Sequence, residues 1–404
     1  MQRLRGIKQL GTASLVFPGA VHTRFEHSIG TCAMAAKLLE ALSAKGCSID
    51  AASKRAILAA ALVHDVGHIP YGHTIEDERR LFPRHDTPAR LSQALTAGEL
   101  GAELARQKLT EEVLAILNKQ HPRPWCGELI SGTICADLLD YLARDAFFCG
   151  LPGRYDARIL RTLNIWDGHL YIAAEKNGII RNDIVSEVLN VLRLRYFLTE
   201  RVFFHHTKTA TGAMISCAVE RAASLGLTQE TLFRLTDERL GALLEYEYGH
   251  DEIIAKVLSC LASRRVYKRA YVLTRQVGQE YKKQLVENYH DNIAARAEAE
   301  SVLCQRCRLP AGDLIIYCPA ANMQLKEANV LLKVNEDIPR PLSSLNVPEV
   351  AVMRENYRNL WRFYVFIHPR QLSKIHRISQ VCEDFFGCEN HLPALQSPQL
   401  YMGI

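Results

Sequence analysis

Apolar residues recur every three to four positions through most of the first 210 residues. This period is typical of helices that bury one face. Residues 56–63 are apolar without interruption, which indicates a helix buried on most sides. Glycines and a proline break the pattern at residues 67–73 and predict a loop. We predict helices at residues 27–42, 51–65, 87–107, 110–119, 128–149 and 184–223.

The pattern changes along the second half of the chain. Residues 225–300 remain helical in period but carry more charge. Beyond residue 310, short runs rich in β-branched and aromatic residues predict strands, and the proline-rich stretch 338–348 predicts a loop. The predicted strands are residues 313–318, 329–334 and 362–368.

Together these elements predict a mainly α fold, with a helical core and a smaller C-terminal α+β lobe. A chain of 404 residues is long enough for two or three structural units. We expect a core at residues 1–210, a helical extension at 211–300 and the α+β lobe at 301–404.

Composition narrows the class of protein. Apolar residues make up 48% of the chain, charged residues 23%, and the net charge is +5. This near balance does not by itself indicate a nucleic-acid or membrane binder. The longest apolar run, residues 56–63, is far shorter than the roughly 20 residues needed to cross a bilayer, and no signal sequence opens the chain. We therefore expect a cytoplasmic protein without a membrane partner.

Twelve cysteines are scattered along the chain, which is typical of free thiols in a reducing compartment. Cys304 and Cys307 form a close pair. A zinc site needs four ligands, commonly from two such pairs, and Cys318, Cys382 and Cys388 do not form a second one. We expect unlinked thiols beside a turn rather than a structural zinc.

The most basic run, residues 264–271, alternates arginine and lysine with tyrosine and lies in the part predicted to be helical. Such side chains bind single-stranded nucleic acid through phosphate pairing and base stacking. A solvated helix face produces the same pattern. Both interpretations stay open on the sequence alone.

Histidine is concentrated near the N-terminus, where six of the 15 lie in the first 85 residues. His64 and Asp65 are adjacent near the end of a predicted buried helix, and Asp137 falls in the middle of a later apolar helix. A buried carboxylate is costly unless a cation or hydrogen bonds compensate it. Together with His27, at the start of an earlier helix, these residues offer two imidazoles and two carboxylates.

This donor set suits a divalent Mn, Fe, Co, Ni, Zn or Mg ion. Because it supplies fewer than six ligands, it leaves positions for water and a phosphate oxygen. The alternative is that each residue is separately a core histidine or a surface carboxylate. Four such residues in one local context favour the metal.

The order of these residues resembles the H…HD…D pattern of the HD-domain metal-dependent phosphohydrolases. Further motifs resemble their deoxynucleoside triphosphate triphosphohydrolase branch, which includes the sterile-alpha-motif and HD-domain enzymes. The resemblance is close over residues 1–150 and looser to about 210. The motifs are residues 2–11, 16–20, 24–28, 64–68 with His73, and 140–145.

The resemblance implies that His27, His64, Asp65 and Asp137 bind the metal ion. It further implies a catalytic group in which His73 donates a proton to the leaving oxygen, His68 lines the phosphate path, and Glu76 and His85 support them. Glu76 stands where relatives have an aspartate. The implied substrate-binding residues are Arg24, Gln9, Leu10, Tyr141, Asp145, Arg195, Phe203 and His205.

Three positions depart from the family pattern. Leu138 follows the last metal-binding aspartate, where relatives have a cation that pairs with phosphate. Phe203 replaces a tyrosine that lies against the sugar. Gln2 and Arg5 match part of a regulatory nucleotide site, whereas the upstream aspartate of that site is absent. By resemblance we also expect a homo-oligomer.

The leading hypothesis is a metal-dependent hydrolase that converts deoxynucleoside triphosphates to nucleoside and inorganic triphosphate. A second hypothesis keeps the metal centre but acts on phosphodiesters of single-stranded DNA or RNA, and the loss of the cation at Leu138 and the basic run favour it. A third is a non-catalytic nucleotide sensor. The complete metal set and His73 argue against the sensor.

Overall fold

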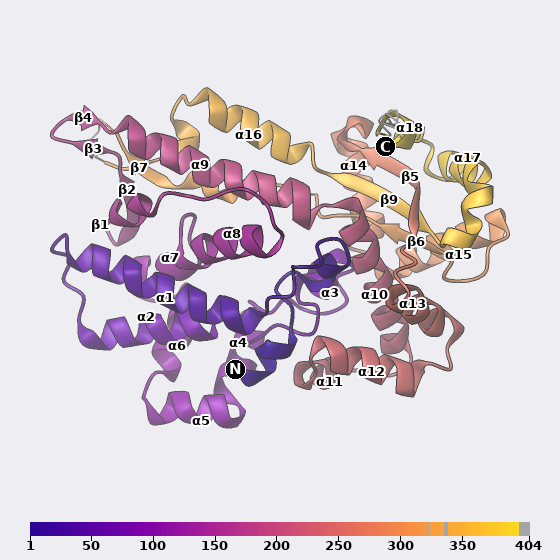
Figure 1. Cartoon of the computed structure of the whole chain (residues 1–404), viewed down its shortest axis with the longest axis horizontal. Helices are drawn as coiled ribbons and strands as arrows, with labels where there is room; N and C mark the ends of the chain where they lie inside the picture. Colours follow the sequence, from indigo (N-terminus) through magenta and orange to yellow (C-terminus); the bar gives the residue numbers. More distant parts are fainter. Residues whose placement is uncertain (322, 335–337, 396–404) are drawn as a thin grey trace.

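The computed structural model describes residues 1–321, 323–334 and 338–395 (Figure 1). The chain is mainly helical with small sheets, as the sequence predicts. The helices of the first 150 residues are α1 (Arg24–Ser43), α2 (Ala51–Val63), α3 (His73–Glu78), α4 (Pro88–Thr96), α5 (Gly98–Arg106), α6 (Thr110–Leu117), α7 (Trp125–Ser131) and α8 (Ala136–Phe148).

Helix α1 lies between α2 and α8 and is the central element of the N-terminal half (Figure 1). Its first turn is fixed by a capping box, in which Thr23 and Glu26 satisfy each other's backbone N–H groups. Leu38 and Leu42 of α1 pack with Ile57 and Ala60 of α2 in one buried cluster. The small alanines of α2 let the two helices approach closely, which brings the end of α2 beside the start of α1.

Three predicted helices are each broken, and the one predicted at 184–223 divides into helices at residues 182–198 and 206–224. The predicted helix 87–107 divides into α4 and α5, with Gly98 in the left-handed region at φ 60°. The predicted helix 128–149 divides into α7 and α8 around residues 132–135. The expectation that Asp137 lies in the middle of a helix is therefore wrong. Asp137 lies in the first turn of α8, where its carboxylate is favoured by the helix dipole.

The interpretation of the first 210 residues as wholly helical is also wrong, because two hairpins lie between α8 and α9 (Asn182–Leu198). Strands β1 (Leu163–Trp166) and β2 (His169–Ala173) pair around Asp167–Gly168, and β3 (Glu175–Lys176) and β4 (Ile179–Ile180) pair around Asn177–Gly178. Both residues of each loop have positive φ. Asp-Gly and Asn-Gly are the usual sequences of such turns.

Strand β2 continues into a mixed sheet with β7 (Leu331–Lys333) and β8 (Arg340–Pro341). The order of this sheet is β1-β2-β7-β8, so it joins segments that are far apart in the sequence. Strand β7 confirms the strand predicted at 329–334, and β8 lies inside the stretch predicted as a loop.

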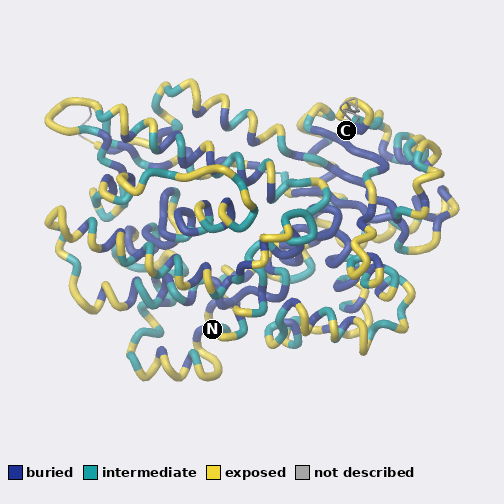
Figure 2. Tube along the Cα trace, viewed as in Figure 1, coloured by how far each residue is buried: buried dark blue, intermediate teal, exposed yellow. Residues whose placement is uncertain are grey.

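A second sheet has the order β5-β9-β6, formed by β5 (Lys268–Thr274), β6 (Leu314–Tyr317) and β9 (Arg362–Ile367). Strands β6 and β9 confirm the strands predicted at 313–318 and 362–368. Strand β5 was predicted to be helical. The alternation of basic and aromatic residues at the start of β5 is a strand pattern, and the last residues of the strand are buried. Figure 2 shows the strands of this sheet as a buried layer.

The remaining helices cover this second sheet and link the two halves. Helix α10 packs against α3, α13 and β6, and small residues such as Ala210 and Ala213 allow the close approach. The helices are α10 (His206–Ser224), α11 (Gln229–Arg234), α12 (Asp237–Tyr248), α13 (Glu252–Ala262), α14 (Gln279–Tyr289), α15 (Ile293–Cys307), α16 (Pro348–Arg358), α17 (Ile375–Phe386) and α18 (Leu392–Leu395). Among the described residues, no helix is both long and apolar enough to span a membrane.

A buried ionic network fixes the end of α3 to the C-terminal half. Arg79 is 1% exposed, and its Nε lies 2.5 Å from Glu220 Oε2 on α10. Its Nη1 lies 3.0 Å from Glu300 Oε1 on α15. Arg296 also donates to Glu220, at 3.2 Å. These contacts neutralise every charge of the group inside the protein.

We expect Arg79→Met to lower the free energy of unfolding by about 3 kcal/mol, because it removes a buried guanidinium that pairs with two largely covered carboxylates. Urea denaturation of the full chain measures this loss. Arg106→Met is the matched control, since its pair with Glu103 is exposed and such pairs contribute little to stability. Equal losses in the two variants would contradict the role of the network.

Candidate active site

The four residues expected to bind metal come together from three elements. His27 lies in the second turn of α1, His64 and Asp65 follow the end of α2, and Asp137 begins α8. One donor atom each from His27, His64 and Asp137 lie within 4.8 Å of one another. Asp65 is next to them, with Oδ1 3.5 Å from His64 Nε2 and Oδ2 3.9 Å from His27 Nε2.

The hydrogen bonds around the two imidazoles leave donor atoms that suit a cation. His64 Nδ1 is 2.7 Å from the carbonyl oxygen of Ala61, and His27 Nδ1 is 2.8 Å from Asp140 Oδ2. Both partners are acceptors, so each Nδ1 carries the proton. The two Nε2 atoms then face each other at 3.3 Å, and His27 Nε2 lies 3.0 Å from Asp137 Oδ1. Unprotonated nitrogens and a carboxylate that converge in this way fit a divalent metal ion.

The pKa shifts of His27 and Asp137 also favour positive charge in the site. Burial lowers the pKa of His27, but hydrogen bonds to Asp137 and Asp140 outweigh burial and raise it to about 10. Burial raises the pKa of Asp137, and the hydrogen bond and charge of His27 outweigh this and lower it. Without a metal ion, a proton on His27 thus supplies the cation that the carboxylates need.

Asp140 is a functional residue that the sequence reasoning missed. It orients His27 through Nδ1 and is itself held by Arg144, with Nε–Oδ2 2.9 Å and Nη2–Oδ1 2.8 Å. A carboxylate behind a metal-binding histidine fixes the ring and raises its basicity. The signal was present, since Asp137, Asp140 and Arg144 follow one another at spacings of three and four on one face of α8.

Arg24 lies beside the metal ligands but is not free. It is 2% exposed, and its Nη1 donates to Asp65 Oδ2 at 2.7 Å. A Cβ at Gly72 would lie 2.6 Å from Arg24 Nη2, so the guanidinium requires a glycine at this position, which also has φ 47°. Gln9 Oε1 is buried without a hydrogen-bond partner in the part of the chain that the structure describes. This acceptor lies near the site, because the backbone carbonyl oxygen of the same Gln9 is 3.5 Å from Arg24 Nη2.

The expected catalytic histidines cluster on the other side of Asp65. His68 Nε2 lies 3.3 Å from Asp65 Oδ1, and His68 stacks on His85 with ring centroids 3.4 Å apart. Glu76 Oε2 binds His85 Nδ1 at 2.8 Å and lies 3.3 Å from His68 Nδ1. Burial, together with Arg24 and His85, lowers the pKa of His68 to about 3, so His68 is neutral near pH 7.

His73 is placed differently from what the resemblance implies. Its side chain is 48% exposed, with ring centroids 4.8 Å from His68 and 5.1 Å from His85. Its Nδ1 is bonded to Asp77 Oδ2 at 2.9 Å rather than to Glu76. Asp77 therefore orients His73 through Nδ1, a partner that the sequence did not indicate.

Three of the expected substrate-binding residues, Tyr141, Arg195 and Phe203, lie together, and Tyr141 is the one next to His27. The Tyr141 ring centroid is 6.5 Å from that of His27 and 6.5 Å from that of Phe203. The Arg195 guanidinium lies 5.4 Å from the Tyr141 ring and 5.2 Å from the Phe203 ring. Leu10 packs against the same hydrophobic cluster as both aromatic residues.

Two others are placed away from this group. Asp145 is 1% exposed, and its Oδ1 lies 2.8 Å from His22 Nε2, so its carboxylate is already bound inside the protein. His205 caps α10 by accepting the backbone N–H of Thr207, and its ring is 6.1 Å from Phe17. His22, for which the sequence suggested no role, thus serves as the partner of Asp145.

The departures from the family pattern have clear structural counterparts. Leu138 is 3% exposed and packs in the hydrophobic core, so nothing at this position reaches the metal centre. Arg5 donates to Gln2 Oε1 at 2.7 Å and stacks on Phe25, and these contacts pair the two residues that resemble a regulatory site with their own neighbours.

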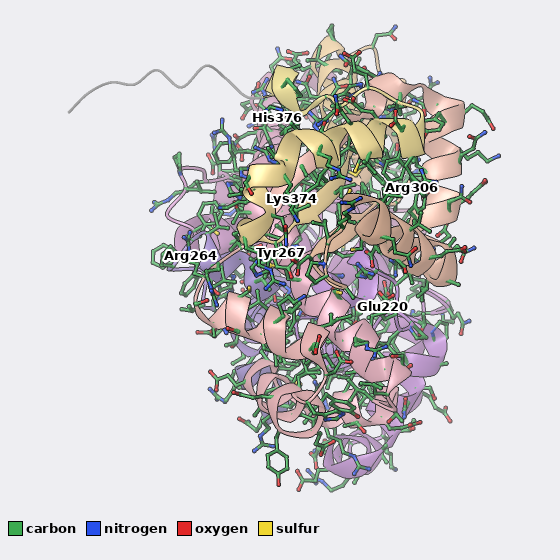
Figure 3. The ribbon with its side chains drawn as sticks, turned by 90° about the vertical axis from the view of Figure 1, so that its right-hand side faces the viewer. Glu220, Arg264, Tyr267, Arg306, Lys374 and His376 are labelled. Carbon is green, nitrogen blue, oxygen red and sulfur yellow. The ribbon has the colours of Figure 1, made fainter. Side chains whose placement is uncertain are left out.

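The basic run does not form an aromatic binding surface. Tyr267 and Tyr271 are 2% and 0% exposed, because they belong to the buried layer at β5. Figure 3 shows Arg264 at the edge of the molecule and Tyr267 further inward. Only the cations of this run reach solvent, and base stacking on its tyrosines is excluded.

Two other features lie apart from the metal centre. Cys304 and Cys307 are buried free thiols on α15, and neither belongs to a group of three metal donors among the described residues. A cavity of about 290 Å³ lies between α7, β2 and the turn at Lys326, and no expected metal ligand lines it. We therefore place the candidate active site at the metal centre and not at this cavity.

Comparison with known proteins agrees with this placement. Residues 24–145 match the HD domain, and residues 156–392 match the HD associated region. The chain belongs to the HD-domain phosphohydrolase family, with an HD domain followed by an HD associated region. All four expected metal ligands lie within the matched HD domain.

Curated relatives share part of their length with this chain. The uncharacterized protein YwfO of Bacillus subtilis is 30% identical over 230 residues, which cover 55% of this chain and 50% of that protein. The mouse deoxynucleoside triphosphate triphosphohydrolase SAMHD1 is 29% identical over 266 residues, which cover 55% of this chain and 40% of that protein. The chain thus spans half or less of the length of these relatives.

Solved structures share the fold over nearly the whole chain. A phosphohydrolase from Bacteroides thetaiotaomicron has a TM-score of 0.68 and 21% identity, covering 91% of this chain and 92% of that one. A hypothetical protein from Aquifex aeolicus has a TM-score of 0.66 and 22% identity, covering 93% and 92%. The C-terminal half is therefore part of the shared fold.

We expect Asp140→Asn to weaken metal binding about 10- to 100-fold while the protein stays folded, because the orienting carboxylate behind His27 is lost. Titration calorimetry of metal-free protein with Mn²⁺ measures the affinity, and circular dichroism checks the fold. Asp156→Asn is the control, since that carboxylate is exposed and remote from the centre. An unchanged affinity in Asp140→Asn would contradict the assigned role.

Proposed function

We propose that the protein is a metal-dependent phosphohydrolase that acts on nucleotides, with deoxynucleoside triphosphates as the first candidate substrates. The observation that carries the proposal is the convergence of His27 Nε2, His64 Nε2 and Asp137 Oδ1 beside Arg24 and His73. The likeness to deoxynucleoside triphosphate triphosphohydrolases supports the choice of substrate. The products would be a nucleoside and inorganic triphosphate.

The chain's own residues supply what this reaction requires. His27, His64, Asp65 and Asp137 would hold a divalent ion, which would lower the pKa of bound water and neutralise phosphate oxygens. Arg24 places a guanidinium at the edge of this centre and offsets the charge of Asp65. His73, half exposed and oriented by Asp77, donates a proton from Nε2 to the leaving oxygen. Gln9 Oε1 accepts a hydrogen bond from a sugar hydroxyl.

A second candidate function is the hydrolysis of phosphodiesters in single-stranded DNA or RNA. Leu138 favours it, because a triphosphate carries more negative charge than a diester and the expected extra cation is missing. The buried tyrosines of the basic run argue against it, since that surface lacks exposed rings for base stacking. A non-catalytic sensor would have no use for the oriented pair of His73 and Asp77. We expect the enzyme to act in the cytoplasm as a homo-oligomer.

Purified protein incubated with Mn²⁺, Mg²⁺ or Fe²⁺ should release inorganic triphosphate and a nucleoside from deoxynucleoside triphosphates, as identified by chromatography. Ribonucleotides and labelled single strands are tested in parallel. Mononucleotides released from a strand would support the second candidate instead. Asp65→Ala and Asp137→Ala should abolish turnover and metal binding together, and activity retained in either variant would refute the site. No turnover with any metal would refute both enzymatic proposals.

We expect His73→Asn to lower kcat about 10²- to 10⁴-fold, because a general acid contributes this much to proton transfer. KM and the affinity for Mn²⁺ at the group of His27, His64 and Asp137 should change little, since His73 belongs to a separate donor group with His68 and His85. Steady-state kinetics and calorimetry separate these effects. His121→Asn is the control. His121 is not part of the centre, and its Nε2 lies 3.2 Å from Glu112 Oε1. A loss of kcat equal to that of the control would exclude His73 as the proton donor.

A further inference from the structure

The exposed cations of the basic run belong to a larger basic surface on the C-terminal half. Residues 253–270, 301–312 and 366–382 together hold ten lysines and arginines and no aspartate or glutamate. Because the whole chain has a net charge of +5, all its other residues together carry −5. We call the surface formed by these ten cations the basic face. Its members are Lys256, Arg264, Arg265, Lys268, Arg269, Arg306, Arg308, Arg370, Lys374 and Arg377.

The fold brings the three segments together at the sheet of β5, β9 and β6. Strand β5 pairs with β9, and Lys268 lies opposite Ile367. The ring centroid of Tyr267 is 5.3 Å from that of His368, and its hydroxyl donates to the carbonyl oxygen of Gly312 at 2.8 Å. This buried tyrosine therefore joins the ends of all three segments.

A second set of contacts joins the end of α15 to α17. The two helices pack together, and Lys374 Nζ donates to the carbonyl oxygen of Arg308 at 3.4 Å. Figure 3 shows Arg264, Arg306, Lys374 and His376 on the side of the molecule that faces the viewer. The cations of the three segments thus lie on one surface, although they are far apart in the sequence.

Most of the positive charge on the basic face has no carboxylate beside it. Lys256 and Arg370 share the buried carboxylate of Asp313, at 2.7 and 2.9 Å from its Oδ1. Among the described residues, none of the other eight cations forms an ion pair with a carboxylate. Arg264 and Lys374 donate instead to backbone carbonyl oxygens, which leaves their charge uncompensated. A surface of this kind attracts polyanions.

The side chains exposed on the basic face suit phosphates rather than bases or lipid chains. Tyr267 and Tyr271 are buried, so neither ring can stack on a base. Leu372 is the one large apolar side chain exposed on the described residues of the three segments, which is too little apolar surface to enter a bilayer. Seven of the ten cations are arginines, whose planar guanidinium groups bind phosphate oxygens in pairs.

We propose that the basic face binds the phosphate backbone of double-stranded nucleic acid without regard to sequence. A duplex keeps its bases inside and presents closely spaced phosphates, so it needs cations but no exposed rings. The three segments lie within the HD associated region and contain none of the expected metal ligands. Binding at this face is therefore independent of turnover at the metal centre, which stays open to mononucleotides.

Fluorescence anisotropy of the full chain with a short labelled DNA duplex tests this surface. The affinity should fall at least about 100-fold between about 50 and 200 mM salt, because contact with four or more phosphates releases their counterions. Arg306→Glu/Lys374→Glu should weaken binding at least about tenfold and make the salt dependence shallower. Lys37→Glu/Lys54→Glu makes the same change of charge at exposed lysines of α1 and α2 and should alter the affinity less than about threefold.

Circular dichroism checks that both double variants keep the wild-type fold. Equal weakening by the two double variants would overturn the basic face, since net charge alone would then explain the binding. Tighter binding of a single strand of the same length, or displacement of the duplex by excess deoxyadenosine 5′-monophosphate, would place the nucleic acid elsewhere and overturn it too. Binding to phosphatidylserine vesicles but not to the duplex, or binding to neither, would also refute it. Absence of nucleotide turnover would refute the proposed function and leave the basic face unaffected.

Discussion

The N-terminal half of the molecule is organised around one electrostatic requirement, a cation where His27, His64 and Asp137 meet. Both imidazoles commit their Nδ1 protons outward, to Asp140 and to a backbone carbonyl, so their Nε2 atoms face inward at 3.3 Å. Two nitrogen acceptors and a carboxylate this close together favour positive charge between them. The packing of α1 against α2 and α8 brings the three residues together, because His27 lies on α1, His64 at the end of α2 and Asp137 on α8.

The surrounding cations are each assigned to a carboxylate. Arg24 pairs with Asp65, Arg144 with Asp140, and Arg195 with Glu327. These three arginines are therefore already paired inside the protein.

The HD associated region contacts the elements that carry the candidate site and also completes the fold. The network of Arg79 holds α3, which carries His73 and Glu76, against α10 and α15. Glu327 reaches Arg195 from a turn far along the chain. The positions of His73 and Arg195 therefore both depend on contacts between the two matched regions, whereas the expected metal ligands come from the HD domain alone.

The sequence by itself determined the fold class, the strands β6, β7 and β9, and the residues that meet at the metal centre, because helical period and ligand identity are local properties. The sequence also contains local patterns that indicate further features. Asp167–Gly168 and Asn177–Gly178 indicate the hairpins, and the spacing of Asp140 behind Asp137 indicates a shared helix face. Only the tertiary structure decided that the tyrosines of β5 are buried, that Asp145 binds His22 and that Glu327 neutralises Arg195. These pairings join residues more than 100 positions apart, so no local pattern encodes them, and burial decides which charges must find each other.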